Sequence, residues 1–166
     1  MNRELRRAMQ REARKAKPNR AQGNLMGNPV ASALIKTQIL KDIQSIQTDA
    51  MLHALIGAND TKLVDNAGRV AYIAAESARL CRIDKGSNEP DMRIIAGMAN
   101  ALYELATNTG DKAMHRLSIT SGLHACQRLI TQCIPWAIGL AALKVDEIIQ
   151  KTQGLTVAHI TQPSPE

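Results

Sequence analysis

The sequence predicts an all-α protein, a bundle of about five helices preceded by a basic N-terminal helical arm. Apolar residues recur every three or four positions along most of the chain, which is the spacing of an amphipathic helix. The chain contains no alternation of strands with helices, no strand meander and no internal repeat. A chain of 166 residues that is 45% hydrophobic is long enough to form one domain without disulfide or metal cross-links.

Basic residues are concentrated in the first segment of the chain. Residues 1–20 hold eight basic and two acidic side chains, and their net charge of +6 equals that of the whole chain. The remaining residues hold 13 basic and 13 acidic side chains. Residues 2–17 lack glycine and proline and consist mainly of good helix formers, so we expect a basic helix that ends at Pro18. Because its cations repel one another, this helix should be only partly formed in isolation.

The composition divides the chain into four segments. Residues 1–20 form the basic arm, 21–28 a hinge rich in turn formers, 29–154 the helical bundle and 155–166 a tail. In the bundle, Asn28-Pro29 is a helix start and Gly57 a helix stop. The first body helix should present a core stripe consisting of Ile35, Ile39, Ile43, Ile46, Ala50 and Ala54.

Four further helices follow in the predicted bundle. The second begins at Asn59 or Asp60, ends at Gly86 and carries many small residues that allow close packing. The third begins in the segment 87–91, which combines a cap, a proline and two acids, and it ends near 108–110. The fourth runs from Asp111 to about Cys133, after which Pro135 either opens a fifth helix or kinks one long helix. Residues 155–160 are expected to form a short extended segment, and 162–166 to be disordered.

The common patterns of catalytic and metal sites are missing from the sequence. Cys81, Cys126 and Cys133 form no Cys-x-x-Cys pair, and we expect them to pack as small apolar residues in a reducing compartment. The four histidines lack the spacing of metal ligands on one helical face. Ser121 and His124 lack the strand and the first glycine of a nucleophile elbow. We therefore expect neither an enzyme nor a cofactor nor a bound metal.

The arm is the strongest functional signal in the sequence. Its arginines outnumber its lysines six to two, which favours bidentate contacts to phosphate or carboxylate groups. Aromatic residues make up only 2% of the chain, so binding by base stacking is not expected. The sequence predicts a non-enzymatic interaction protein whose arm docks on nucleic acid or a nucleoprotein assembly without reading its base sequence. The predicted contact residues are Arg3, Arg6, Arg7, Arg11, Arg14, Lys15, Lys17 and Arg20, with Arg3, Arg7, Arg11 and Arg14 along one face.

Two other interpretations remain open at the level of sequence. The arm can be a solvated tail that serves only solubility, or it can bind an acidic protein. Alternatively, the helical body itself binds a protein or forms a homo-oligomer, as a structural or inhibitory accessory protein would. The first residues, Asn2-Arg3-Glu4-Leu5-Arg6-Arg7-Ala8-Met9, resemble the starts of many small phage and mobile-element proteins. With no apolar run long enough to span a bilayer and no signal peptide, the expected location is the cytoplasm, of a host cell included, or a virion.

Overall fold

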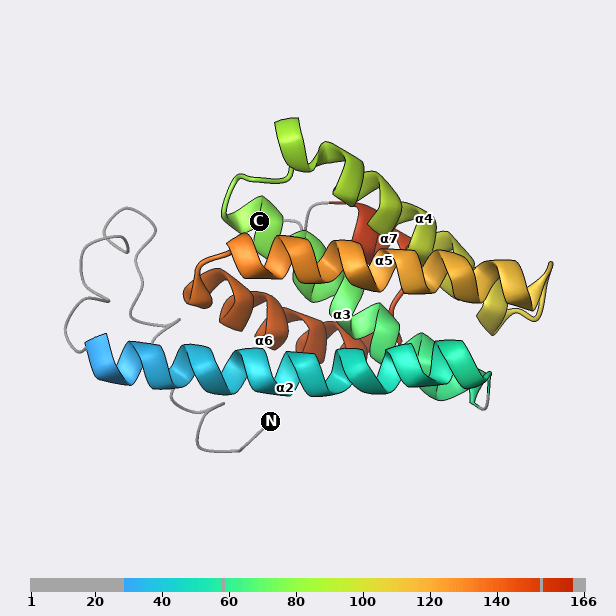
Figure 1. Ribbon diagram of the computed structural model, residues 1–166, viewed down its shortest axis with the longest axis horizontal. Helices are drawn as coiled ribbons and strands as arrows, with labels where there is room; N and C mark the ends of the chain where they lie inside the picture. Colours follow the sequence, from blue (N-terminus) through green and yellow to red (C-terminus); the bar gives the residue numbers. More distant parts are fainter. Residues whose placement is uncertain (1–28, 58, 153, 163–166) are drawn as a thin grey trace.

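The computed structural model describes residues 29–57, 59–152 and 154–162, and of residues 29–36 only the backbone. The basic arm and the hinge lie outside the described residues. Within them the fold is all-helical and contains no strand, and Figure 1 shows six α-helices packed side by side. They are α2 (Pro29–Ile56), α3 (Asp60–Leu80), α4 (Glu89–Ala106), α5 (Lys112–Gln132), α6 (Pro135–Thr152) and α7 (Val157–Thr161), with a 3₁₀ turn, η2 (Gly86–Asn88), before α4.

The end of α2 and the start of α3 lie where the local sequence signals predict. Gly57 follows α2 with a φ of 65°, in the left-handed region that glycine adopts without a steric penalty. Asn59 caps α3, because its side chain accepts a hydrogen bond from the Lys62 backbone N–H at 3.0 Å. Of the predicted core stripe of α2, the residues Ile39, Ile43, Ala50 and Ala54 are buried and Ile46 is half-buried.

Helix α3 is the central helix of the bundle and packs against each of the other five. Every residue from Val70 to Ala78 is buried, so the helix has no solvent-facing side over this stretch. Four of these nine residues are alanines, Ala71, Ala74, Ala75 and Ala78, which let the neighbouring helices approach closely. The small residues noted in the sequence therefore have the packing role predicted for them.

The predicted end of α3 at Gly86 is wrong, since the helix ends at Leu80 and Cys81 is its C-cap. Arg82 adopts the left-handed conformation with a φ of 57°. The Ile83 N–H then bonds to the Ala78 carbonyl, and the Arg82 N–H bonds to that of Arg79, as in a Schellman motif. An arginine at the position usually taken by glycine concealed this helix end in the sequence.

The boundaries of α4, α5 and α6 agree with the sequence prediction. Asn108, with a φ of 55°, ends the α4 region, and the Asp111 side chain caps α5 by accepting from the Ala113 N–H at 2.8 Å. Cys133 leaves α5 with an extended backbone, and Pro135 is the first residue of α6. Pro135 therefore opens a separate helix and does not kink a long one.

The expected extended segment at 155–160 is also wrong, because Val157–Thr161 forms α7. The Thr156 and His159 side chains form a capping box at its start. Ile160 is buried in the core, and its carbonyl accepts a hydrogen bond of 2.7 Å from Arg79 Nη2. One buried apolar side chain and one largely buried arginine thus hold a five-residue helix that would be unstable alone.

Candidate functional site

The eight basic residues predicted to contact a partner all lie in residues 1–20, outside the described part of the chain. The cations of the body differ from those of the arm, because many of them are paired with carboxylates of the body. Among the described residues, eight basic side chains of the body form ion pairs with the body's own carboxylates: Lys62, Arg69, Arg79, Arg93, Lys112, Arg116, Arg128 and Lys144. These pairs locally cancel the field of the body's cations, whereas the arm carries four times as many basic as acidic side chains.

One polar cluster is buried between α3, α6 and α7. The Glu76 side chain is 4% exposed, and its carboxylate lies 2.7 Å from Lys144 Nζ and 3.7 Å from Arg79 Nη1. Arg79 is itself 13% exposed and donates to the Ile160 carbonyl. The cluster joins three helices, because Lys144 of α6 and Arg79 of α3 share the Glu76 carboxylate and Arg79 also bonds to α7.

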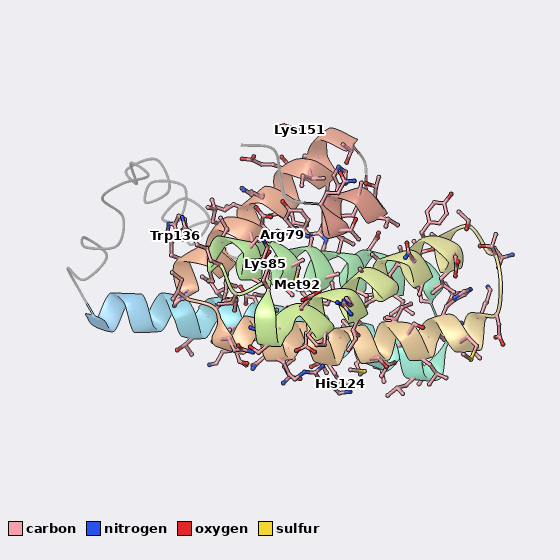
Figure 2. The ribbon with its side chains drawn as sticks, turned by 90° about the horizontal axis from the view of Figure 1, so that it is seen from above. Arg79, Lys85, Met92, His124, Trp136 and Lys151 are labelled. Atoms are coloured by element: carbon pink, nitrogen blue, oxygen red, sulfur yellow. The ribbon has the colours of Figure 1, made fainter. Side chains whose placement is uncertain are left out.

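A small cavity of about 180 Å³ lies beside this cluster. Ala75, Met92, Ile95 and Ile160 give it an apolar lining, and Arg79 brings a largely buried charge to its wall. Figure 2 shows Arg79 and Met92 near each other, on α3 and α4. Glu89 also lines the cavity, but it is exposed and paired with Arg93 at 2.6 Å. Among the described residues, no histidine, cysteine or serine lines this cavity.

The histidines of the described body lie at different helix ends or on the surface. His115 is buried, with Nε2 2.8 Å from the Thr109 carbonyl and Nδ1 3.2 Å from a Glu104 carboxylate oxygen, so it holds the α4–α5 turn. His159 belongs to the cap of α7. His124 is exposed at the edge of the molecule in Figure 2, and Ser121 is exposed as well. Within the described ranges, no group of three or more His, Cys, Asp or Glu side chains is placed to hold a metal ion.

The predicted burial is confirmed for two of the three cysteines, and the structure adds a relation between two cysteines that was not predicted. Cys126 and Cys133 are buried, as their place on the apolar stripe of α5 predicts. The sequence did not indicate that the half-buried Cys81 would influence the pKa of Cys133 from the end of a neighbouring helix. The two residues are far apart in sequence and share no motif, so only the packing of α3 on α5 brings them together.

Exposed apolar side chains gather at the end of the bundle where α2 and α4 finish and α5 begins. Arg116 of α5 bonds to the Gly57 carbonyl at 3.4 Å, and His115 bonds to the α4–α5 turn, so these three helix ends are neighbours. Of the eight large exposed apolar side chains among the described residues, six belong to these ends: Leu52, Leu55, Ile56, Tyr103, Met114 and Leu117. We call this set the apolar end. Such a concentration on one end of a domain is typical of a protein-binding surface.

In comparisons with known proteins, no protein-family model, no curated protein and no solved structure matches this chain. No helix of the described ranges combines the length and the apolar character needed to cross a bilayer.

Proposed function

We propose that this chain is a non-enzymatic helical interaction protein whose basic arm docks on nucleic acid or a nucleoprotein assembly. One observation carries the proposal: residues 1–20 contain the whole net charge of +6. The ion pairs of the body support it, because a body that neutralises its own cations leaves the arm as the segment with unbalanced positive charge. Its site of action would be the cytoplasm, of a host cell included, or a virion, where three free cysteines are compatible with reducing conditions.

The proposed contact is with the sugar–phosphate backbone. Each phosphate neutralised by an arginine releases condensed counterions, so binding gains free energy at low salt and loses it as salt rises. Six of the eight arm cations are arginines, whose planar guanidinium groups bind two phosphate oxygens at once. Binding of this kind does not discriminate between base sequences.

The test is a fluorescence-anisotropy titration of mixed-sequence duplex and single-stranded DNA and RNA at several salt concentrations. The chain is compared with a variant that carries Arg3→Gln, Arg7→Gln, Arg11→Gln and Arg14→Gln. If each arginine neutralises one phosphate, the slope of log K against log salt should fall by about 3.6 on B-DNA. A truncated chain that starts at Asn28 should lose binding altogether while keeping its helical circular dichroism.

A matched control removes four exposed cations from the body instead, through Lys41→Gln, Arg82→Gln, Lys85→Gln and Lys151→Gln. The two variants have the same net charge, so a difference between them reports where the charge is located and not how much there is. The proposal fails if both variants lose affinity equally, or if the unaltered chain binds no nucleic acid at low salt.

A second candidate function is protein binding through the helical body, as in a structural or inhibitory accessory protein. The apolar end favours it, since Leu55 at 72% and Leu117 at 63% are the most exposed large apolar side chains of the described body. A pull-down from the cell of origin, with Leu55→Gln and Leu117→Gln as the variant, tests this candidate. Ile134→Gln is the matched control, because Ile134 is exposed to 55% just beyond the opposite end of α5. Loss of a captured protein with the first variant and not with the control would support the body as the binding element, and equal capture by both would contradict it.

A further inference from the structure

Helices α3 and α5 are a parallel pair of equal length. Each contains 21 residues, and both run in the same direction across the bundle in Figure 1. Their N-terminal ends are joined by Asp60, whose carboxylate lies 2.7 Å from Arg116 Nη2 and 3.0 Å from Lys112 Nζ. Because an α-helix rises by the same amount per residue, two parallel helices that start at one level also end at one level.

The C-terminal ends of both helices are cysteines. Cys81 is the C-cap of α3 and Cys133 is the C-cap of α5. A second contact at this end fixes the two segments, since the side chains of Asn88 and Gln132 exchange hydrogen bonds of 3.1 and 3.4 Å. The α3–α4 connection, which begins at Cys81, is therefore held against the last turn of α5, next to Cys133.

Cys81 and Cys133 thus lie at neighbouring helix ends, and the Cys81 thiol influences the pKa of Cys133. Burial, followed by the charge and the hydrogen-bonding contact of the Cys81 thiol, raises the pKa of Cys133 to about 12. Cys126 is different, because its raised pKa comes mainly from burial and no other thiol contributes to it. Of the three cysteine pairs, only Cys81 and Cys133 lie at neighbouring helix ends and influence each other in this way, and Cys81 is partly accessible to solvent.

We propose that Cys81 and Cys133 are a redox-reactive thiol pair that a small-molecule disulfide converts into an intramolecular disulfide. The thiolate of the accessible Cys81 attacks the oxidant, here oxidised glutathione, and displaces one reduced glutathione as the mixed disulfide forms. Cys133 then loses its proton to solvent, attacks the Cys81 sulfur and displaces the second reduced glutathione. Two protein thiols are oxidised by two electrons, and one molecule of oxidised glutathione is reduced to two thiols.

The disulfide would tie the end of α3 to the end of α5 and so cross-link the three helices α3, α4 and α5. A cross-link in a chain with free thiols is expected to be reversible and sensitive to the redox state of its surroundings. Because the second step needs the Cys133 thiolate, its high pKa predicts slow closure near neutral pH that accelerates as pH rises.

The experiment exposes the folded, reduced full-length chain to oxidised glutathione and follows free thiols and intact mass. The expected product has lost two thiols and two hydrogens, carries no glutathione, and yields a Cys81–Cys133 cross-linked peptide after proteolysis. The rate of closure should rise close to tenfold per pH unit below the pKa of Cys133. Reduction with dithiothreitol should restore all three thiols.

Three variants locate the chemistry. Cys126→Ala should form the same disulfide at the same rate, whereas Cys81→Ser should be neither cross-linked nor glutathionylated while folded. Cys133→Ser should stop at the mixed disulfide on Cys81. The inference is overturned if the native chain accumulates only the glutathione adduct, if the cross-link includes Cys126, or if closure occurs only after denaturant is added.

Discussion

Gly122 lies on α5 where that helix packs against α4. A Cβ atom added at this position would overlap the Cβ and Sδ atoms of Met98, so Gly122 sets how closely the two helices approach. Gly97 on α4 is the opposite case, since a Cβ there meets nothing within 4 Å. Both glycines occupy helix interiors, and the difference between them is therefore one of packing and not of backbone conformation.

The two glycines give a matched prediction for stability. Gly122→Ala should lower the free energy of unfolding by about 1–3 kcal/mol, because α4 and α5 must move apart. Gly97→Ala should raise it by about 0.5–1 kcal/mol, because alanine favours the helix and fills open space. Urea denaturation followed by circular dichroism measures both. Equal effects of the two substitutions would mean that α4 and α5 do not pack closely at Gly122.

Glu76 is the buried carboxylate shared by Lys144 and Arg79, and its removal leaves the largely buried Arg79 without its anion. Glu76→Gln should lower the free energy of unfolding by roughly 3 kcal/mol, within the range for breaking a buried ion pair. Glu89→Gln, which breaks the exposed pair with Arg93, should cost less than about 1 kcal/mol. Chemical denaturation at neutral pH compares the two variants, and similar costs would show that the Glu76 cluster is hydrated.

The buried thiols predict a loss of stability in alkali. The pKa of Cys133 is raised from 9.0 to about 12 by burial and by Cys81, so above pH 9 the unfolded chain releases this proton and the folded chain retains it. Stability from this group is complete below pH 9 and is lost as the pH rises through 9 toward 12. In Cys133→Ala, the fall of unfolding free energy with pH should be shallower by up to about 1.4 kcal/mol per pH unit. Urea titrations in the presence of a phosphine reductant measure it, and parallel pH profiles for the two chains would contradict the prediction.

Among the described elements, most helix starts follow from local chemistry. Asn59 and Asp111 cap α3 and α5 with their own side chains, and Pro135 opens α6, so these starts are legible in a few adjacent residues. The end of α3 is not, because Arg82 adopts a left-handed conformation that its residue type does not favour. The turn is closed by local hydrogen bonds from the Ile83 and Arg82 N–H groups to the Ala78 and Arg79 carbonyls, and the residue type at position 82 does not indicate it.

Helix α7 shows how tertiary contacts can create an element. Its five residues are too few for a stable isolated helix, and its buried Ile160 supplies its main apolar anchor. Ile160→Ala should lower the free energy of unfolding by about 2–4 kcal/mol and should release α7 from α3 and α4. Hydrogen exchange of the 157–161 amides tests the release. Retained protection in the variant would show that the capping box alone maintains this helix.

At the scale of the whole molecule, the net positive charge belongs to the N-terminal segment and not to the helical body. Residues 1–20 hold the net +6, and the remainder holds equal numbers of both signs. The chain should therefore bind a cation exchanger at neutral pH, and a truncated chain starting at Asn28 should pass through it. The four-residue body variant Lys41/Arg82/Lys85/Lys151→Gln should elute at lower salt than the unaltered chain but should still be retained. Retention of the truncated chain would mean that the ion pairs of the body do not cancel its cations.

The redox pair and the apolar end also belong to this scale. Closure of the Cys81–Cys133 disulfide would restrict a loop of roughly fifty residues in the unfolded chain, a stabilisation of up to about 4 kcal/mol in the chain-entropy description. The apolar end depends on three helix termini meeting, and no single one of them carries an unusual apolar surface in the sequence. The redox pair arises from the parallel packing of α3 and α5, and the apolar end arises where α2 and α4 finish beside the start of α5.

The sequence alone determines the helical class, most helix starts and the position of the charge, because periodicity, capping and charge counts depend on residues close together in the chain. Tertiary structure decides that α3 is the central helix, that Glu76 is buried with two cations, that Gly122 faces Met98 and that Cys81 meets Cys133. Most of these contacts join residues on different helices. Their proximity follows from how helices of matched length and complementary side-chain size pack together, and no local pattern records it.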